Sequence, residues 1–103
     1  MVIFKYEYDH NRSGYEKFCM EMPLNHEVLS VQIQNGRFCV WAKVDREQKE
    51  SVFRKFLILG TGIDLSIFEQ DMTYVCTFQQ DWFVGHVFTY DDPTLLRPDH
   101  WKN

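Results

Sequence analysis

The chain has 103 residues, 45% of them hydrophobic and 17% aromatic, and a formal net charge of −4. This length suits one domain with one core, and the interspersed acids and bases form no basic stripe for non-specific nucleic-acid binding. The opening MVIFKYEYDH mixes apolar and charged residues, so we expect neither a signal peptide nor a membrane span there.

The cysteine pattern bears on compartment and metal. Cys19, Cys39 and Cys76 are widely spaced and form no C-x-x-C pair. An odd number without that spacing indicates neither a disulfide framework nor a cysteine zinc site. We therefore expect a soluble intracellular protein with no metal or other cofactor.

The first two strands are predicted by alternation. Val2, Phe4, Tyr6 and Tyr8 share one face, and turn-forming residues fill positions 9–14. A second alternating run follows and stops at Pro23. We expect these two strands to pair as a hairpin with a long loop.

The strongest short-range signal is LSVQIQNGRFCVWAKVD at residues 29–45. Its Asn35-Gly36 pair favours a type I′ turn between two strands, and such a two-residue loop fixes the register. One face is expected to be core and pairs Ile33 with Phe38, Val31 with Val40, and Leu29 with Ala42. The other face is mixed and pairs Gln34 with Arg37, Gln32 with Cys39, and Ser30 with Trp41.

Three further strands are predicted in the second half. The fifth, near residues 52–59, is apolar on both sides toward its end, so that end should be buried on both faces. Residues 63–70 fit either an irregular segment or one helical turn capped by Asp64. Strands six and seven begin at Met72 and Trp82, with a turn at residues 79–81, and Gly85 indicates a bulge or a close backbone approach.

Seven short strands without helical patterns between them predict an all-β fold. The spacing fits a small antiparallel β-sandwich or a partly open barrel, and does not choose between the two. We assign one β domain to residues 1–90. Residues 91–103, with two prolines and little alternation, are expected to form a C-terminal tail of low order.

Several blocks together carry a family resemblance. They are residues 3–7 (IFKYE), the 29–45 hairpin, the GTG at 60–62, YVCTFQQ at 74–80 and FVGHVF at 83–88. In this order they resemble a family of small proteins of tailed bacteriophages and prophages, grouped as a domain of unknown function. The resemblance implies a phage origin and a compact fold, and it implies no activity.

Three features of the sequence offer weak evidence of chemistry. The GTG at residues 60–62 could form an anion-binding nest, but no P-loop spacing follows it, and a tight turn is the better interpretation. His86 could act as a general base or a binding residue, although no acid is placed to orient it. Cys39, Cys76 and His86 could converge on zinc, but isolated cysteines in strands more often pack as small hydrophobes.

The best functional lead is a set of indoles and amides. Such side chains suit stacking on a planar base or anchoring a protein interface. The set comprises Gln32, Trp41, Gln79, Gln80 and Trp82. The alternative is that Trp41 covers its sheet as part of a second packing layer.

We therefore expect a non-enzymatic bacteriophage accessory protein in the host cytoplasm that acts by binding a host protein, in host takeover or evasion of host defences. One alternative is a sponge for a signalling nucleotide, held with help from Arg37 or Arg54. Another is a homo-oligomeric structural or accessory protein. The candidate binding residues are Gln32, Arg37, Trp41, Gln79, Trp82 and His86.

Overall fold

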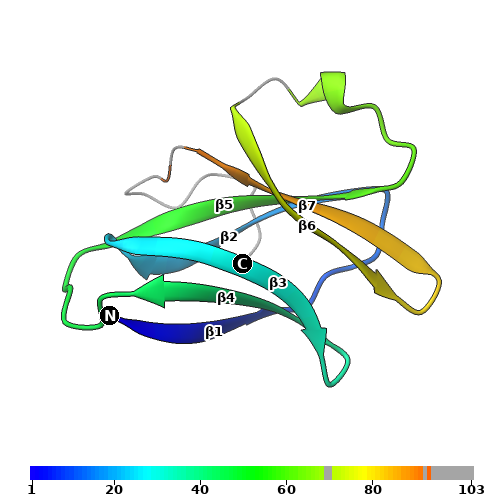
Figure 1. The fold of residues 1–103 in the computed structure, drawn as a ribbon. Helices are drawn as coiled ribbons and strands as arrows, with labels where there is room; N and C mark the ends of the chain where they lie inside the picture. The colour runs from blue at the N-terminus through cyan, green and yellow to red at the C-terminus, as the bar shows by residue number, and fades with distance from the viewer. Residues whose placement is uncertain (69–70, 92, 94–103) are drawn as a thin grey trace.

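The computed structural model describes residues 1–68, 71–91 and 93, and its fold is a β-sandwich (Figure 1). Its strands are β1 (Val2–Tyr8), β2 (Tyr15–Pro23), β3 (His26–Gln34), β4 (Arg37–Val44), β5 (Ser51–Gly60), β6 (Met72–Gln80) and β7 (Phe83–Tyr90). They form two antiparallel sheets, with strand orders β1-β4-β3 and β2-β5-β7-β6. The all-β prediction is confirmed, and the sheets are open rather than closed into a barrel.

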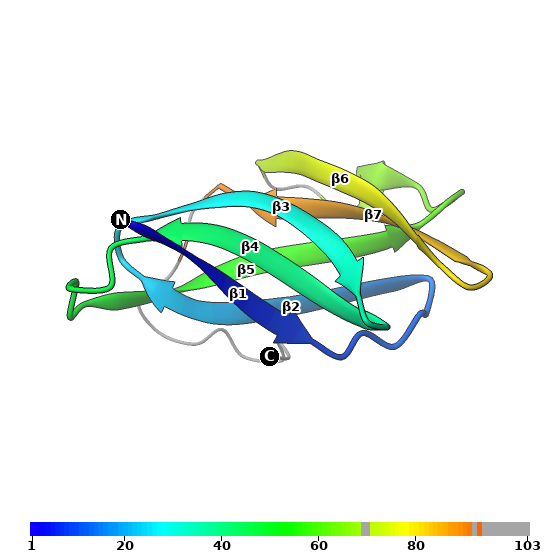
Figure 2. The same cartoon turned by 60° about the horizontal axis from the view of Figure 1, so that its bottom comes forward.

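The first two strands do not pair with each other, so the predicted β1–β2 hairpin is wrong. β1 pairs with β4 and β2 pairs with β5, and the loop at residues 9–14 crosses from one sheet to the other (Figure 2). Tyr8 and Phe18 then meet across the interior, with stacked rings whose centroids lie 3.9 Å apart. Alternation revealed which face of each strand is buried, but it carries no information about which strand is its neighbour.

The central hairpin is confirmed, with one correction. Asn35 and Gly36 have φ of 52° and 77°, as a type I′ turn requires. The predicted pairings hold from the turn as far as Ser30 with Trp41. Beyond that point a bulge at Leu29 shifts the register, so Val28 rather than Leu29 lies opposite Ala42, and Leu29 is 43% exposed.

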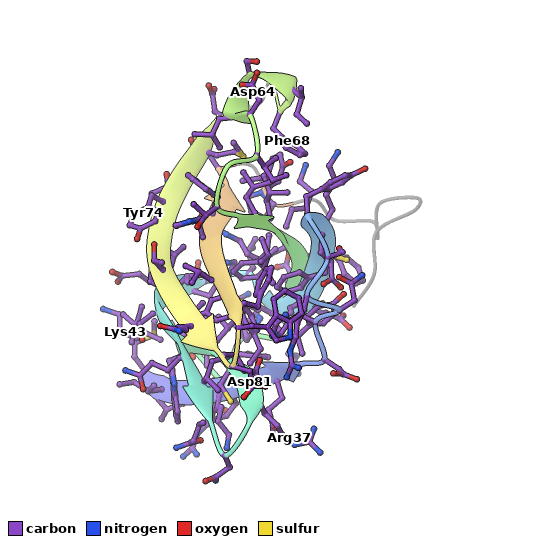
Figure 3. The ribbon with its side chains drawn as sticks, turned by 90° about the vertical axis from the view of Figure 1, so that its right-hand side faces the viewer. Arg37, Lys43, Asp64, Phe68, Tyr74 and Asp81 are labelled. Atoms are coloured by element: carbon purple, nitrogen blue, oxygen red, sulfur yellow. The ribbon has the colours of Figure 1, made fainter. Side chains whose placement is uncertain are left out.

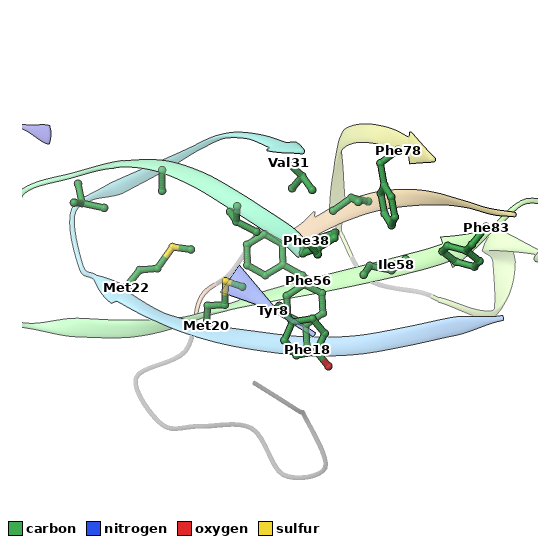
Figure 4. Close-up of a cluster of buried hydrophobic side chains, with 14 residues drawn as sticks. Tyr8, Phe18, Met20, Met22, Val31, Phe38, Phe56, Ile58, Phe78 and Phe83 are labelled. Carbon is green, nitrogen blue, oxygen red and sulfur yellow. The ribbon is translucent and has the colours of Figure 1, made fainter. Parts of the chain in front are cut away.

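Aromatic rings join the two sheets in the core (Figure 4). Phe18 stacks on Tyr8 on one side and on Phe56 on the other, where the centroids are 5.1 Å apart. Phe38, from the central strand of the smaller sheet, meets Phe18 and Phe78 edge to face at 5.7 and 5.4 Å. These geometries are the favourable ones for aromatic pairs, so the interior is one interlocked unit.

A second apolar cluster covers the outer face of the four-stranded sheet. Leu57, Leu59 and Tyr90 are buried there, and Ile63 and Phe68 pack against them. β5 is therefore buried on both faces toward its end, as predicted.

The covering segment contains one 3₁₀ turn, Leu65–Ile67, and Asp64 caps it by accepting from the Ser66 backbone N–H at 2.9 Å (Figure 3). Asp64 is thus the predicted cap.

Of the expected tail, only Asp91 and Pro93 belong to the described residues; the remainder lies outside them. Among the described residues, no helix has the length and apolar character needed to cross a membrane.

Gly85 is required by side-chain crowding rather than by a bulge of its own strand. The irregularity lies in the neighbouring strand, between Tyr74 and Cys76. A Cβ atom at Gly85 would lie 2.7 Å from the ring of Phe78 and 2.8 Å from that of Phe83. Gly85 is closely approached, as predicted, but by the rings of Phe78 and Phe83 and not by another backbone segment.

Gly85→Ala should therefore destabilise the fold by about 1–3 kcal/mol, because two core rings must shift to admit the methyl group. Gly60→Ala is the matched control, since Gly60 pairs with Gly85 in the adjacent strand and its added Cβ would lie 3.5 Å from the nearest atom. Urea unfolding measures both. Equal stabilities of the two variants would contradict the crowding.

Candidate functional site

Four connections meet at one end of the sandwich, here called the loop end. They are the β1–β2 loop, the β3–β4 turn, the β6–β7 turn and the chain just after β5. Two hollows lie side by side there, and Arg12 lines both. One is a polar cavity of about 320 Å³ and the other an open groove of about 520 Å³.

His10 and Gln80 bracket the polar cavity. The Gln80 amide nitrogen donates to the Gly36 carbonyl at 2.7 Å, so its oxygen faces His10 Nε2 at 2.6 Å. That oxygen can only accept, so His10 carries a proton on Nε2 and donates it. These two hydrogen bonds tie the β1–β2 loop and the β3–β4 turn to the end of β6, three segments that are far apart in the sequence.

The His10 ring is fixed in orientation. It is only 9% exposed and packs against Phe38, Phe78 and Phe83, with centroids 5.6, 5.3 and 5.8 Å away. Its Nδ1 is buried and makes no hydrogen bond within the described part of the chain. Because Nε2 holds the proton, neutral His10 presents Nδ1 as a hydrogen-bond acceptor.

The start of β2 anchors the β1–β2 loop. The Tyr8 hydroxyl donates to one oxygen of the buried Glu16 carboxylate, and the Asn11 backbone N–H donates to the other at 2.8 Å. Burial, followed by the Glu16 hydrogen bond and charge, raises the pKa of Tyr8. The phenol therefore remains a donor throughout the neutral range, and the loop is held at both ends.

Two arginines form the rim of the polar cavity. Arg12, with φ of 56°, lies 3.4 Å from the Asp81 carboxylate, and Arg37 lies 3.4 Å from that of Glu7. Figure 3 views the molecule from this end and shows Arg37 and Asp81 there. Exposed ion pairs contribute little stability, so these contacts mainly position the rim.

Trp82 stands beside the groove. Its side chain is 73% exposed, and it meets the buried Phe83 edge to face at 5.8 Å. Gly14 and Gly60 also line the groove, where the Gly60 N–H donates to the Gly14 carbonyl at 2.9 Å. The groove therefore combines a bulky exposed ring with a stretch of glycine backbone.

Of the six residues predicted as a binding set, two come together at the loop end. Arg37 lines the polar cavity and Trp82 the groove. Gln79 is exposed on the outer side of β6 and donates to the Asp81 carbonyl at 3.3 Å. Gln80, named in the wider set, belongs to β6 rather than to the turn and points inward, where it forms the bracket.

The other predicted residues lie on the two outer faces. Gln32 and Trp41 are on the outside of the three-stranded sheet, and His86 is on the outside of the four-stranded sheet. Trp41 is half-buried and belongs to neither apolar cluster, with the Lys5 ammonium 5.9 Å from its ring. Within the described residues, Trp41 is therefore part of neither a second core layer nor a shared cavity with His86.

His86 is held by hydroxyl groups. Thr61 and Thr77 lie 2.8 and 2.9 Å from its two ring nitrogens, and the Tyr74 hydroxyl bonds to Thr77 at 2.6 Å. Gly62, at φ of 95°, makes the GTG a tight turn that presents Thr61 to His86. A threonine hydroxyl thus occupies the position at which a catalytic triad has its carboxylate.

The suggested zinc ligands do not converge. Cys39 is on the outer side of β4, Cys76 donates inward to the Val31 carbonyl at 3.4 Å, and His86 is on the opposite outer face. Among the described residues, no group of three or more metal-ligating side chains was found.

Sequence reasoning missed the centre of the site. His10 and Arg12 lie in a stretch interpreted only as turn-forming, and the partner of His10 is 70 residues away. The sequence pattern assigned Glu16 no role. A single sequence gives no signal for such long-range pairs.

Gln80→Met should lower the free energy of unfolding by about 1–3 kcal/mol, because it leaves the N–H of the buried His10 ring without its acceptor. Gln79→Met, one residue away but exposed, should change it by less than about 0.5 kcal/mol. Chemical denaturation of both variants tests this. If the Gln80→Met variant were as stable as the wild type, the Gln80–His10 hydrogen bond would not contribute to the stability of the fold.

Comparison with known proteins places the chain in a family without an assigned role. No curated protein and no solved structure matches it significantly. The model of one family, described as a domain of unknown function, matches residues 1–95 and so covers the whole sandwich. The chain belongs to this family, Domain of unknown function (DUF7352).

Proposed function

We propose that this protein is a non-enzymatic binding protein whose loop end recognises another protein, with Trp82 as the anchoring side chain. The observation that carries the proposal is that Trp82, on the β6–β7 turn of the four-stranded sheet, is 73% exposed. Tryptophan is among the residues that dominate binding energy at protein interfaces.

Rigidity of the loop end supports this role. Asp81, the residue before Trp82, has φ of 55° and lies beside Arg12, and Gln80 on its other side is fixed by two hydrogen bonds. A surface already held in shape loses little conformational entropy on binding. The mixed charges of the rim, from Arg12, Arg37 and Asp81, suit the polar periphery of a protein interface.

The identity of the partner class rests on the sequence resemblance. The blocks between residues 3 and 88 resemble bacteriophage proteins, which favours a host protein as the partner, during takeover of the host cell or evasion of its defences. The nucleotide sponge is less well supported at this end. Arg37 lines the polar cavity, but the aromatic rings beneath it are packed in the core and offer no open face for a base.

The hydroxyl partners of His86 support a non-enzymatic role. Each of its ring nitrogens is engaged by threonine, and no described carboxylate hydrogen-bonds to it. Without such a partner the imidazolium formed during general-base catalysis would be poorly stabilised.

Trp82→Ala should weaken the complex with the partner about 30-fold or more, which corresponds to the 2 kcal/mol or greater loss typical of an anchoring residue. The partner is first isolated from host lysate with the wild-type protein, purified and then titrated against each variant. Trp41→Ala, on the other side of the molecule, is the matched control and should bind as the wild type does.

Because Trp82 is exposed, its removal should leave the melting temperature nearly unchanged, so a loss of binding cannot be ascribed to unfolding. Equal affinity of the Trp82→Ala and wild-type proteins would overturn the proposal. A wild-type protein that binds only itself, with a mass that rises with concentration, would point to the homo-oligomer instead.

A further inference from the structure

A charged side chain lies between the sheets at the end opposite the loop end. Arg54 occupies the inner side of β5, in register with the core residue Met20. Its Nη2 donates to the Thr89 hydroxyl at 3.2 Å, and its Nε is buried without a hydrogen-bond partner in the described part of the chain. A buried guanidinium N–H without a partner is costly, so its retention calls for a reason.

His26 presents a second unpartnered nitrogen in the same place. Its Nδ1 lies 2.8 Å from the Pro23 carbonyl, which can only accept, so Nδ1 carries a proton. Its Nε2 is buried and has no hydrogen-bond partner among the described residues. The Pro23 contact also fixes the ring, so Nε2 is held in a set direction.

The two side chains line one cavity of about 310 Å³. It lies where the edges of β3 and β6 meet, and the other polar lining groups include the side chains of Thr73 and Thr89. A guanidinium, an imidazolium and hydroxyl groups are donors that proteins use for phosphate and carboxylate groups. Because Nδ1 of His26 is committed to Pro23, its Nε2 becomes such a donor when the ring is protonated.

Nearby acids leave the positive charge of Arg54 only partly offset. Asp91 interacts electrostatically with Arg54, but its carboxylate accepts from the Thr73 hydroxyl at 2.8 Å. Glu27, which also lines the cavity, lies 3.3 Å from the Lys43 ammonium. Neither carboxylate occupies the unfilled Nε position of Arg54.

We propose that this cavity binds a small ligand through an oxyanion, phosphate or carboxylate, held by Arg54 and His26 with help from the hydroxyl of Thr89. The site is separate from the loop end and does not rest on the protein-binding proposal. Its volume exceeds that of inorganic phosphate, so a larger molecule bearing the oxyanion would fit.

Proton linkage agrees with this assignment. Burial lowers the pKa of His26, and the charge of Arg54 lowers it further, with Glu27, Tyr74 and Asp91 as the other titratable groups nearby. A bound anion favours the imidazolium form and so raises the pKa of His26 again. Binding should therefore take up a proton and tighten as the pH falls through the ordinary pKa of histidine.

The test is an NMR titration of the full chain with inorganic phosphate and, separately, with acetate. The Nε–H resonance of Arg54 and the ring resonances of His26 should shift and saturate, and those of His10 and His86 should stay. Whichever probe binds more tightly identifies phosphate or carboxylate as the preferred group. Arg54→Met should weaken binding about tenfold or more, since a charge-assisted hydrogen bond is lost.

Arg37→Met, which removes an arginine at the loop end, is the matched control and should bind as the wild type does. Should Arg54→Met not fold, Arg54→Lys retains the charge without the Nε–H, and His26→Gln removes the second ligand; both should weaken binding. The proposal is overturned if neither anion shifts Arg54 and His26 at saturating concentration, or if binding persists unchanged in these variants.

Discussion

The ring of Phe38 is the contact on which the rest of the structure depends. It projects from the central strand of the smaller sheet and meets Tyr8 and Phe18 on one side and Phe78 on the other. It also packs against His10 at 5.6 Å. The Phe38 ring therefore packs in the core between the two sheets and also lines the floor of the polar cavity. Because the core is closely packed, this contact also restricts motion at the loop end.

The interior is apolar in the middle and polar at both ends, and the two ends differ in chemistry. At the loop end Gln80 bonds to His10 and the Gly36 carbonyl, and Glu16 bonds to Tyr8 and the Asn11 N–H, which fixes the surface that carries Trp82. Of these side chains, His10 keeps one nitrogen, Nδ1, without a partner in the described part of the chain. At the other end Arg54 and His26 each retain an unpartnered nitrogen. One end is thus suited to present a surface, and the other to hold a ligand.

Local signals in the sequence predicted the local structure well. Asn35-Gly36 predicted its turn because few residue pairs accept positive φ at both positions. The continuous apolar run at the end of β5 predicted burial on both faces of the sheet. The pairing partner of β1 could not be predicted, since any strand with the same alternation of apolar and polar residues could pair with it. The bulge at Leu29 was invisible for a similar reason, because it changes the register without changing the composition.

The site was harder to predict than the fold. The β6–β7 turn was predicted at residues 79–81, but β6 runs to Gln80 and the turn is at residues 81–82, so Gln80 was placed in a turn instead of on the inner face of a strand. The bracket with His10 depends on contacts between distant segments, which a single sequence does not reveal. Arg54 could have been placed inside, because it shares its parity with the apolar Val52 and Phe56.

The most direct test of the central claim, recognition of a protein through the loop end, is a map of the bound surface. Isotope-labelled protein is titrated with the purified protein that it retains from lysate, and the backbone amide resonances that shift are located on the structure. Shifts are expected around Trp82, Arg12 and Gly60, and the outer face of the three-stranded sheet should be unaffected. Shifts centred on Trp41 and Gln32 instead would contradict the claim.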